Sequence, residues 1–217
     1  ACGDQGVDSR LETLQHDSEM GIANLTRTAG EIYTDLLELG SAYIPALSPA
    51  GDEAAVLTEQ GYGILKGEVL AGFLEGEAVK GLELLAGGPS ADVLEAELPG
   101  QRVSVRVTSS CTKSGLEFSG DAPSTLKLVC NIQCRLSEYR QRPDREELSK
   151  LEAALEGQER LRLEAALARL RELEADCTGL GAKAAMVHPA KWQKIRDNWP
   201  EWFSRVPVEI QVEVKIL

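Results

Sequence analysis

The sequence is poor in the residues and motifs that most enzymes need. It contains only two histidines, His16 and His188, and its five cysteines form no CxxC pair. GxSxG, HExxH, Walker and GxGxxG patterns are absent as well. These absences argue against a zinc site, a thioredoxin-like redox pair and the common hydrolase and nucleotide-binding classes. We therefore expect a protein that is not an enzyme and holds no metal or cofactor, with an uncharacterised enzyme as the third-ranked interpretation.

Long uncharged apolar runs are missing too. A transmembrane helix needs about 20 consecutive apolar residues, and no segment of the 217 residues approaches that length. Hydrophobic residues make up 43% of the chain and charged residues 27%, as is typical of a globular protein with a core. We therefore expect a globular chain without a membrane-spanning helix.

Basic side chains are scarce in the first half of the chain. Residues 1–100 carry 18 acidic and 4 basic side chains, whereas residues 101–217 carry 17 acidic and 19 basic ones. A field this negative repels phosphate backbones, which argues against nucleic acid as a partner. The acidic side chains otherwise indicate a solvated surface.

The first 90 residues show a helical pattern after a polar start. Residues 1–10 are small and polar and predict a flexible tether. Between about residues 18 and 43, apolar residues recur every three or four positions, which predicts a long amphipathic helix. Residues 61–88 are apolar on all sides of a helical wheel and rich in glycine, the pattern of a buried helix with closely packed neighbours. We therefore assign residues 11–90 to a helical region.

A second function is open for the glycine-rich residues 61–88. Such a segment can refold or insert into a membrane, as in a pore-forming effector, so a membrane-active protein is our second interpretation. Four glutamates interrupt its apolar surface: Glu68, Glu75, Glu77 and Glu83. They weaken this interpretation because they leave no continuous apolar face.

The pattern changes to a period of two in the second region, residues 91–217. Alternating apolar and polar residues predict strands near 101–109, 125–137 and 205–217. Each strand has one polar face, which is typical of an antiparallel or mixed sheet. We therefore predict an α+β fold in which a helical N-terminal half docks on a small sheet of three or four strands.

A charged helical segment, residues 144–177, is inserted before the last strand. One leucine stripe ends at Leu155, and a second stripe, which includes Leu163 and Leu170, is displaced by one residue across Gly157. A displacement at glycine predicts either a helical hairpin or a kinked long helix, and we slightly favour the hairpin. The stripes suit coiled-coil packing, so Leu163 and Leu170 are candidate partner-binding residues.

Aromatic residues make up only 5% of the chain, yet all three tryptophans fall within eleven residues. They belong to a predicted helix over 189–204 that is flanked by basic side chains. Tryptophan beside basic groups suits a membrane interface, a peptide or a glycan, although such a stripe also forms the lid of a core. The candidate partner-binding residues in this helix are Trp192, Trp199, Trp202 and Phe203.

Four cysteines fit two disulfides. Cys130 and Cys134 share one face of a predicted strand about 13 Å apart, too far to pair with each other. The economical pairing is therefore Cys111–Cys130 and Cys134–Cys177, with buried free thiols as the alternative. Two disulfides would indicate an oxidising compartment.

The fifth cysteine lies in Ala1-Cys2-Gly3-Asp4, which resembles the last lipobox residue of a bacterial lipoprotein followed by its lipid-modified cysteine. This resemblance implies a lipid on Cys2 and membrane attachment through it. We therefore predict an exported, non-enzymatic accessory or binding protein of the bacterial envelope that holds a protein partner or self-associates. The predicted location is the periplasm, the outer membrane or the exterior, with the cytoplasm as the alternative.

Overall fold

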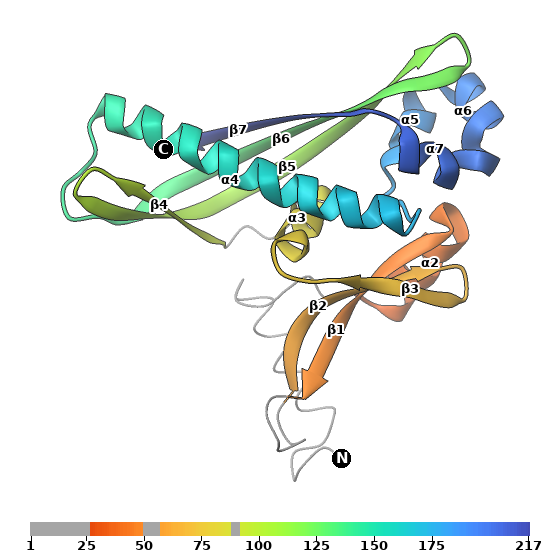
Figure 1. Cartoon of the computed structure of the whole chain (residues 1–217), viewed down its shortest axis with the longest axis horizontal. Coiled ribbons are helices and arrows are strands. Elements are labelled where there is room, and N and C mark those ends of the chain that lie inside the picture. The colour runs from red at the N-terminus through yellow and green to blue at the C-terminus, as the bar shows by residue number, and fades with distance from the viewer. Residues whose placement is uncertain (1–26, 50–56, 88–91) are drawn as a thin grey trace.

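The computed structural model describes residues 27–49, 57–87 and 92–217. Within them the chain is α+β, as predicted, with a three-stranded sheet in the order β1-β2-β3 and a four-stranded sheet in the order β4-β5-β6-β7 (Figure 1). Cys2 and the predicted tether over residues 1–10 lie outside the described residues.

The smaller sheet replaces most of the helix expected before residue 90. Helix α2 (Ala29–Leu39) ends at Gly40, and β1 (Ser41–Pro49), β2 (Leu57–Lys66) and β3 (Val69–Leu74) then pair antiparallel. Only α3 (Glu77–Ala86) is helical within residues 61–88. Among the described residues, the helix predicted up to residue 43 is present only over Ala29–Leu39, and the helix predicted over 61–88 is present only over Glu77–Ala86; the rest of these predictions is wrong where strands stand instead.

Two glycines explain why helical periodicity misleads here. Gly40 has φ 72°, a left-handed conformation that terminates α2. Gly67 has φ 58° and lies in the tight turn between β2 and β3. Both faces of the β2–β3 hairpin carry apolar residues, one face against the core and the other exposed. Read as a helix, the same residues lie on all sides of the helical wheel.

The larger sheet contains β4 (Val93–Leu98), β5 (Gln101–Ser119), β6 (Ala122–Glu138) and β7 (Val208–Ile216). β4, β5 and β6 pair antiparallel, whereas β7 runs parallel to β6, so the sheet is mixed. A parallel neighbour requires a long crossover, and the helices between residues 145 and 205 provide it.

Helix α4 (Arg145–Glu172) is one helix of 28 residues that lies along the larger sheet (Figure 1). The predicted hairpin at Gly157 is therefore wrong. Glu159 lies in line between Leu155 and Leu163, and all three side chains are buried. The two leucine stripes are thus a single stripe with a glutamate inside it. Asp144 begins the helix with a capping box, in which Glu147 participates.

The tryptophans lie in short helices at one end of the larger sheet (Figure 1). These helices are α5 (Leu180–Val187), α6 (Pro189–Ile195), the 3-10 turn η1 (Arg196–Asn198) and α7 (Trp199–Arg205). The rings of Trp192 and Trp199 meet edge to face at 5.3 Å. A Cβ on Gly181 would lie only 2.4 Å from Trp199, so this glycine is required for the packing.

Candidate functional site

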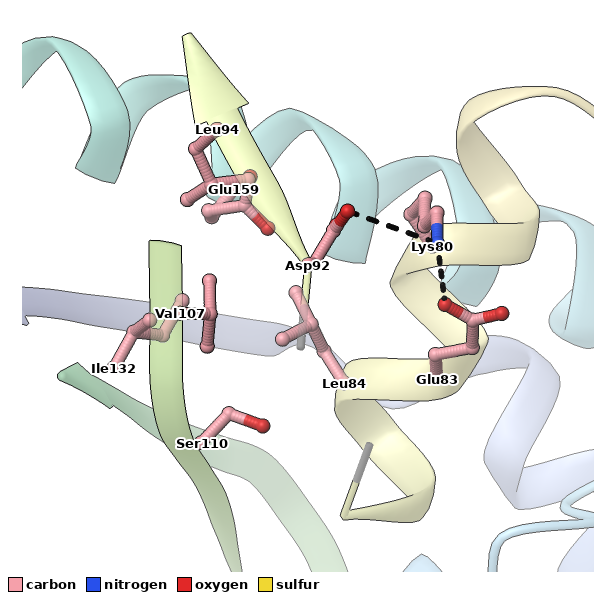
Figure 2. Close-up of a pocket in the computed structure, with 9 residues that line it drawn as sticks. All are labelled: Lys80, Glu83, Leu84, Asp92, Leu94, Val107, Ser110, Ile132 and Glu159. Carbon is pink, nitrogen blue, oxygen red and sulfur yellow. Dashed lines mark hydrogen bonds and ion pairs between the residues drawn. The ribbon is translucent and has the colours of Figure 1, made fainter. Parts of the chain in front are cut away.

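A group of charged side chains lies where α3, α4 and the start of β4 meet, and two of its members, Glu83 and Glu159, are buried (Figure 2). We call it the charge cluster. Its members come from three separate segments: Glu77, Lys80 and Glu83 from α3, Asp92 from the residue before β4, and Glu159 and Arg162 from α4. A small pocket beside it is lined by Leu84, Leu94, Val107 and Ile132.

A close backbone contact between α3 and α4 brings the cluster together. A Cβ on Gly81 would lie 2.0 Å from the carbonyl oxygen of Arg162 and 2.8 Å from the Cβ of Ala166. Only glycine fits at such a distance. The neighbouring Lys80 and Glu83 are therefore held against the part of α4 that carries Glu159 and Arg162.

Arg162 is the central donor in the part of the charge cluster that α4 carries. Its Nη1 donates to Oε1 of Glu159 at 2.7 Å, and its Nε donates to Oε2 of Glu77 at 2.8 Å. An oxygen of Asp92 lies 3.7 Å from the same Nη1. A planar guanidinium can serve several carboxylates at fixed angles, so Arg162 ties α4 to both other segments.

Glu83 is the central acceptor in the part of the charge cluster that α3 carries. It accepts a hydrogen bond from the buried hydroxyl of Tyr62 at 3.1 Å and one from Nζ of Lys80 at 3.0 Å. Lys80 also lies 3.9 Å from Asp92 (Figure 2). Because Tyr62 belongs to β2, the charge cluster links the smaller sheet to the larger one.

Two of the carboxyl groups bind protons more tightly than usual. Burial raises the pKa of Glu159 to about 7; Arg162 opposes this rise and Asp92 adds to it. Burial also raises the pKa of Glu83, against the opposing effect of Lys80. Four carboxyl groups share two cations here, so the favourable charge contacts offset only part of the effect of burial on the pKa of Glu159.

This chemistry fits a structural lock better than a reaction centre. The carboxylates are held by Lys80, Arg162 and Tyr62, and the other lining side chains are mostly apolar. Among the described residues, no group of three or more His, Cys, Asp or Glu is arranged to hold a metal ion. The charge cluster can hold or release a proton on a buried carboxyl group, and its ion pairs hold α3 against α4.

Sequence reasoning missed this site because it assigned all carboxylates to solvated surfaces. One signal was available. Glu159 follows Leu155 by four residues and precedes Leu163 by four, which places it on the buried stripe of a continuous helix. A glutamate at that position predicts a buried, paired carboxylate.

Most of the predicted partner-binding side chains are buried in the protein's own core. Leu163, Leu170 and Phe203 are fully buried, and Trp199 is 6% exposed. They cannot form a surface for a partner, and that prediction is wrong: the stripes pack against the chain's own sheet and helices. Trp192 and Trp202 are half-buried and stay predictions.

The predicted disulfides are wrong, because Cys111, Cys130, Cys134 and Cys177 are all free thiols. Cys111 lies opposite Asn131 and is exposed, whereas Cys130 is buried, so the two side chains point to opposite faces of the hairpin. Cys134 lies near Glu152 and Glu159, and Cys177 follows the far end of α4, about 20 Å further along. The inference of an oxidising compartment loses its basis.

The membrane-active interpretation loses most of its helical segment, since residues 57–66 and 69–74 are strands and only Glu77–Ala86 is helical. Leu74 is buried, while Val69 and Phe73 are exposed on β3. In the described ranges of the chain, no helix combines the length and the apolar character that crossing a bilayer requires.

Comparison with known proteins adds a family and a fold. The family model "Spore germination B3/GerAC like, C-terminal" matches residues 60–217. The crystal structure of the GerBC protein superimposes with a TM-score of 0.76 over 88% of this chain, at 21% sequence identity. The match covers 61% of that chain, so the present chain spans less than two thirds of its length. A comparison with curated proteins gives no significant match.

Proposed function

Because this chain belongs to the Spore germination B3/GerAC-like, C-terminal family, we propose that it is a non-enzymatic subunit of a spore germination receptor and acts by binding another protein of that receptor. The match over residues 60–217 carries the proposal, since it spans the charge cluster and the whole larger sheet. The scaffold supports a binding role, because Arg162 and Tyr62 pair the buried carboxylates of Glu159 and Glu83 and so hold α4 and β2 against α3.

The periplasmic, outer-membrane, extracellular and cytoplasmic locations expected from the sequence are wrong, because the members of this family are lipoproteins associated with the spore membrane. We propose that a lipid on Cys2 holds the protein at that membrane. The motif Ala1-Cys2-Gly3-Asp4 supports this attachment. One acyl chain binds a bilayer only marginally, so stable attachment needs more than one chain on this cysteine.

Spores of the native bacterium provide the test. We expect the wild-type protein in the spore membrane fraction, where it co-purifies with other receptor proteins after cross-linking. Deletion should slow the fall in optical density that nutrients induce in spores by at least tenfold. Germination at the normal rate in the deletion strain would contradict the proposal.

The lipid attachment has its own test. Cys2→Ala should move the protein to the soluble fraction, whereas Cys111→Ala, which changes an exposed cysteine on β5, should leave it in the membrane. Mass spectrometry of the N-terminal peptide should find a lipid adduct on Cys2. A membrane-bound Cys2→Ala protein would contradict attachment at this residue.

A further inference from the structure

Strand β7 forms one edge of the larger sheet, so half of its backbone N–H and C=O groups point away from the sheet. The carbonyl of Pro207 accepts from the N–H of Leu126, and the N–H of Leu217 donates to the carbonyl of Cys134. In a parallel ladder alternate residues bond to the neighbouring strand. The odd-numbered residues of β7 therefore bond to β6, and the N–H groups of the even-numbered residues point away from the sheet.

Helix α4 caps this edge at one end only. Oε1 of Glu152 accepts from the N–H of Ile216 at 2.9 Å, and Oε1 of Glu156 accepts from the N–H of Val214 at 3.2 Å. These carboxylates close the end of the edge to another strand, as natural proteins often do with exposed edges. They also show that acidic oxygens fit beside this strand.

The other end of the edge is open. A recess between α4 and β7, which we call the β7 groove, is lined by Arg160, Glu164, Leu167, Arg171, Val208 and Ile210. Within the described part of the chain, no side chain accepts a hydrogen bond from the outward N–H of Val208 or Ile210. Residues 208–212 extend for about 13 Å, which is enough for four or five residues of an added strand.

Charge indicates what this edge accepts. Arg160 is exposed and forms no ion pair with any described residue. Arg171 is fixed by hydrogen bonds from Nε and Nη2 to the carbonyl of Ser204, at 3.2 and 2.9 Å. Glu164 is the single acid among the lining residues. Two cations beside unpaired backbone donors favour an incoming acidic side chain.

We propose that the β7 groove binds an extended segment of a partner protein that carries an acidic residue, and that this segment joins the sheet as a strand beside β7. The proposal deepens the proposed receptor function and rests on it for the identity of the partner. Glu156 at one end sets the limit of the added strand, and Arg160 receives its carboxylate.

A displayed library of random dodecapeptides, selected on the full chain, tests the proposal. We expect enrichment of peptides with an Asp or Glu between β-branched residues. Synthetic copies should slow amide hydrogen exchange at Val208 and Ile210. They should bind at least tenfold more weakly to Arg160→Glu and to Ile210→Pro, which removes an outward N–H at a sheet edge where proline is tolerated. Arg142→Glu, the same charge change at an exposed site beyond β6, should bind within twofold of the wild type.

Failure to enrich peptides above background would overturn the proposal. So would peptides that bind the wild type, Arg160→Glu and a folded Ile210→Pro equally well. If Ile210→Pro does not fold, Arg160→Glu and the exchange rates decide alone. If no peptide binds the β7 groove but the protein still co-purifies with receptor proteins from spores, the groove proposal fails and the proposed receptor function stands. If peptides bind the groove but the protein does not co-purify with the receptor, the proposed receptor function fails and the groove proposal stands.

Discussion

Glu159 shows how strongly a single buried carboxyl group can be set by its surroundings. It is 2% exposed, lies on the leucine stripe of α4 and contacts Arg162 at 2.7 Å. A carboxylate removed from water is costly, and one arginine shared with Glu77 and Asp92 offsets only part of that cost. The group therefore keeps its proton to a higher pH than an exposed glutamate does.

This pKa predicts the sign of a pH effect on stability. The pKa of Glu159 is about 7 in the folded chain against an ordinary value of 4.5. Between these values the folded state binds more protons than the unfolded state, so the free energy of unfolding falls as pH rises from 4.5 to 7. The glutamine of Glu159→Gln cannot titrate, so the free energy of unfolding of this variant should fall by about 3 kcal/mol less than that of the wild type over this pH range.

Urea unfolding at a series of pH values between 4.5 and 8 measures the effect. Glu164→Gln, an exposed change on the same helix, serves as the control and should keep the wild-type slope. A Glu159→Gln protein with an unchanged slope would show that this carboxyl group titrates normally.

The cysteines give a second prediction at the residue scale. Burial raises the pKa of Cys134 to about 11 and also raises the pKa of Cys130 and Cys177. Only thiolates react readily, so in a Cys2→Ser chain Ellman's reagent should modify one thiol, Cys111, before unfolding. Three more should react in denaturant. Fewer than four reactive thiols in total would restore the case for a disulfide.

At the scale of elements, the α3–α4 contact depends on a glycine. Gly81→Ala would drive a Cβ against the backbone of Arg162 and should lower the free energy of unfolding by about 3 kcal/mol. Gly157 lies within α4 with no atom near its ideal Cβ, so Gly157→Ala should raise the free energy of unfolding by up to about 1 kcal/mol.

Thermal and urea unfolding of the two variants make a matched comparison, since the same methyl group is added to both helices. A stabilised Gly81→Ala protein would mean that α3 lies further from α4. A destabilised Gly157→Ala protein would favour a break in α4 at this position.

At the scale of the whole molecule, α4 joins the two sheets. Its Glu152 and Glu156 bind the edge of β7 in the larger sheet. Toward its other end, Nε of Arg169 donates to the carbonyl of Phe73 in β3, at 3.1 Å. Lys66 of β2 contacts Glu174 just beyond the helix, at 3.0 Å. The larger and smaller sheets are therefore held on one helix.

Disruption of the buried face of α4 should consequently unfold the molecule. Leu163→Glu with Leu170→Glu places two carboxylates where the native side chains are fully buried. The lost apolar burial and the buried charge together exceed about 6 kcal/mol, a large part of the stability of an ordinary domain. Circular dichroism and sedimentation should find an unfolded or aggregated chain. A folded variant that merely lost self-association would return these leucines to an interface.

Local patterns were enough for some of the structure. The alternation near residues 101–109, 125–137 and 205–217 corresponds to β5, β6 and β7, because each strand has one buried and one wet face. The helical spacing over 144–177 corresponds to α4, because this helix also has one buried and one exposed face. The domain boundary near residue 90 stays a prediction. The charge cluster was not predictable as a set, because its residues are up to 85 positions apart.

The sequence by itself determined the α+β class, the position of three strands and the helical character of the charged segment 144–177, since these depend on periods of two and 3.6 residues. Tertiary structure decided the rest. Pairing between β1, β2 and β3 made strands of residues whose spacing resembles a helix. Burial of Glu159 between α3 and the larger sheet raised the pKa of this carboxyl group, which the sequence had suggested to be a surface charge. Contacts between distant segments set both outcomes, and no local pattern contains them.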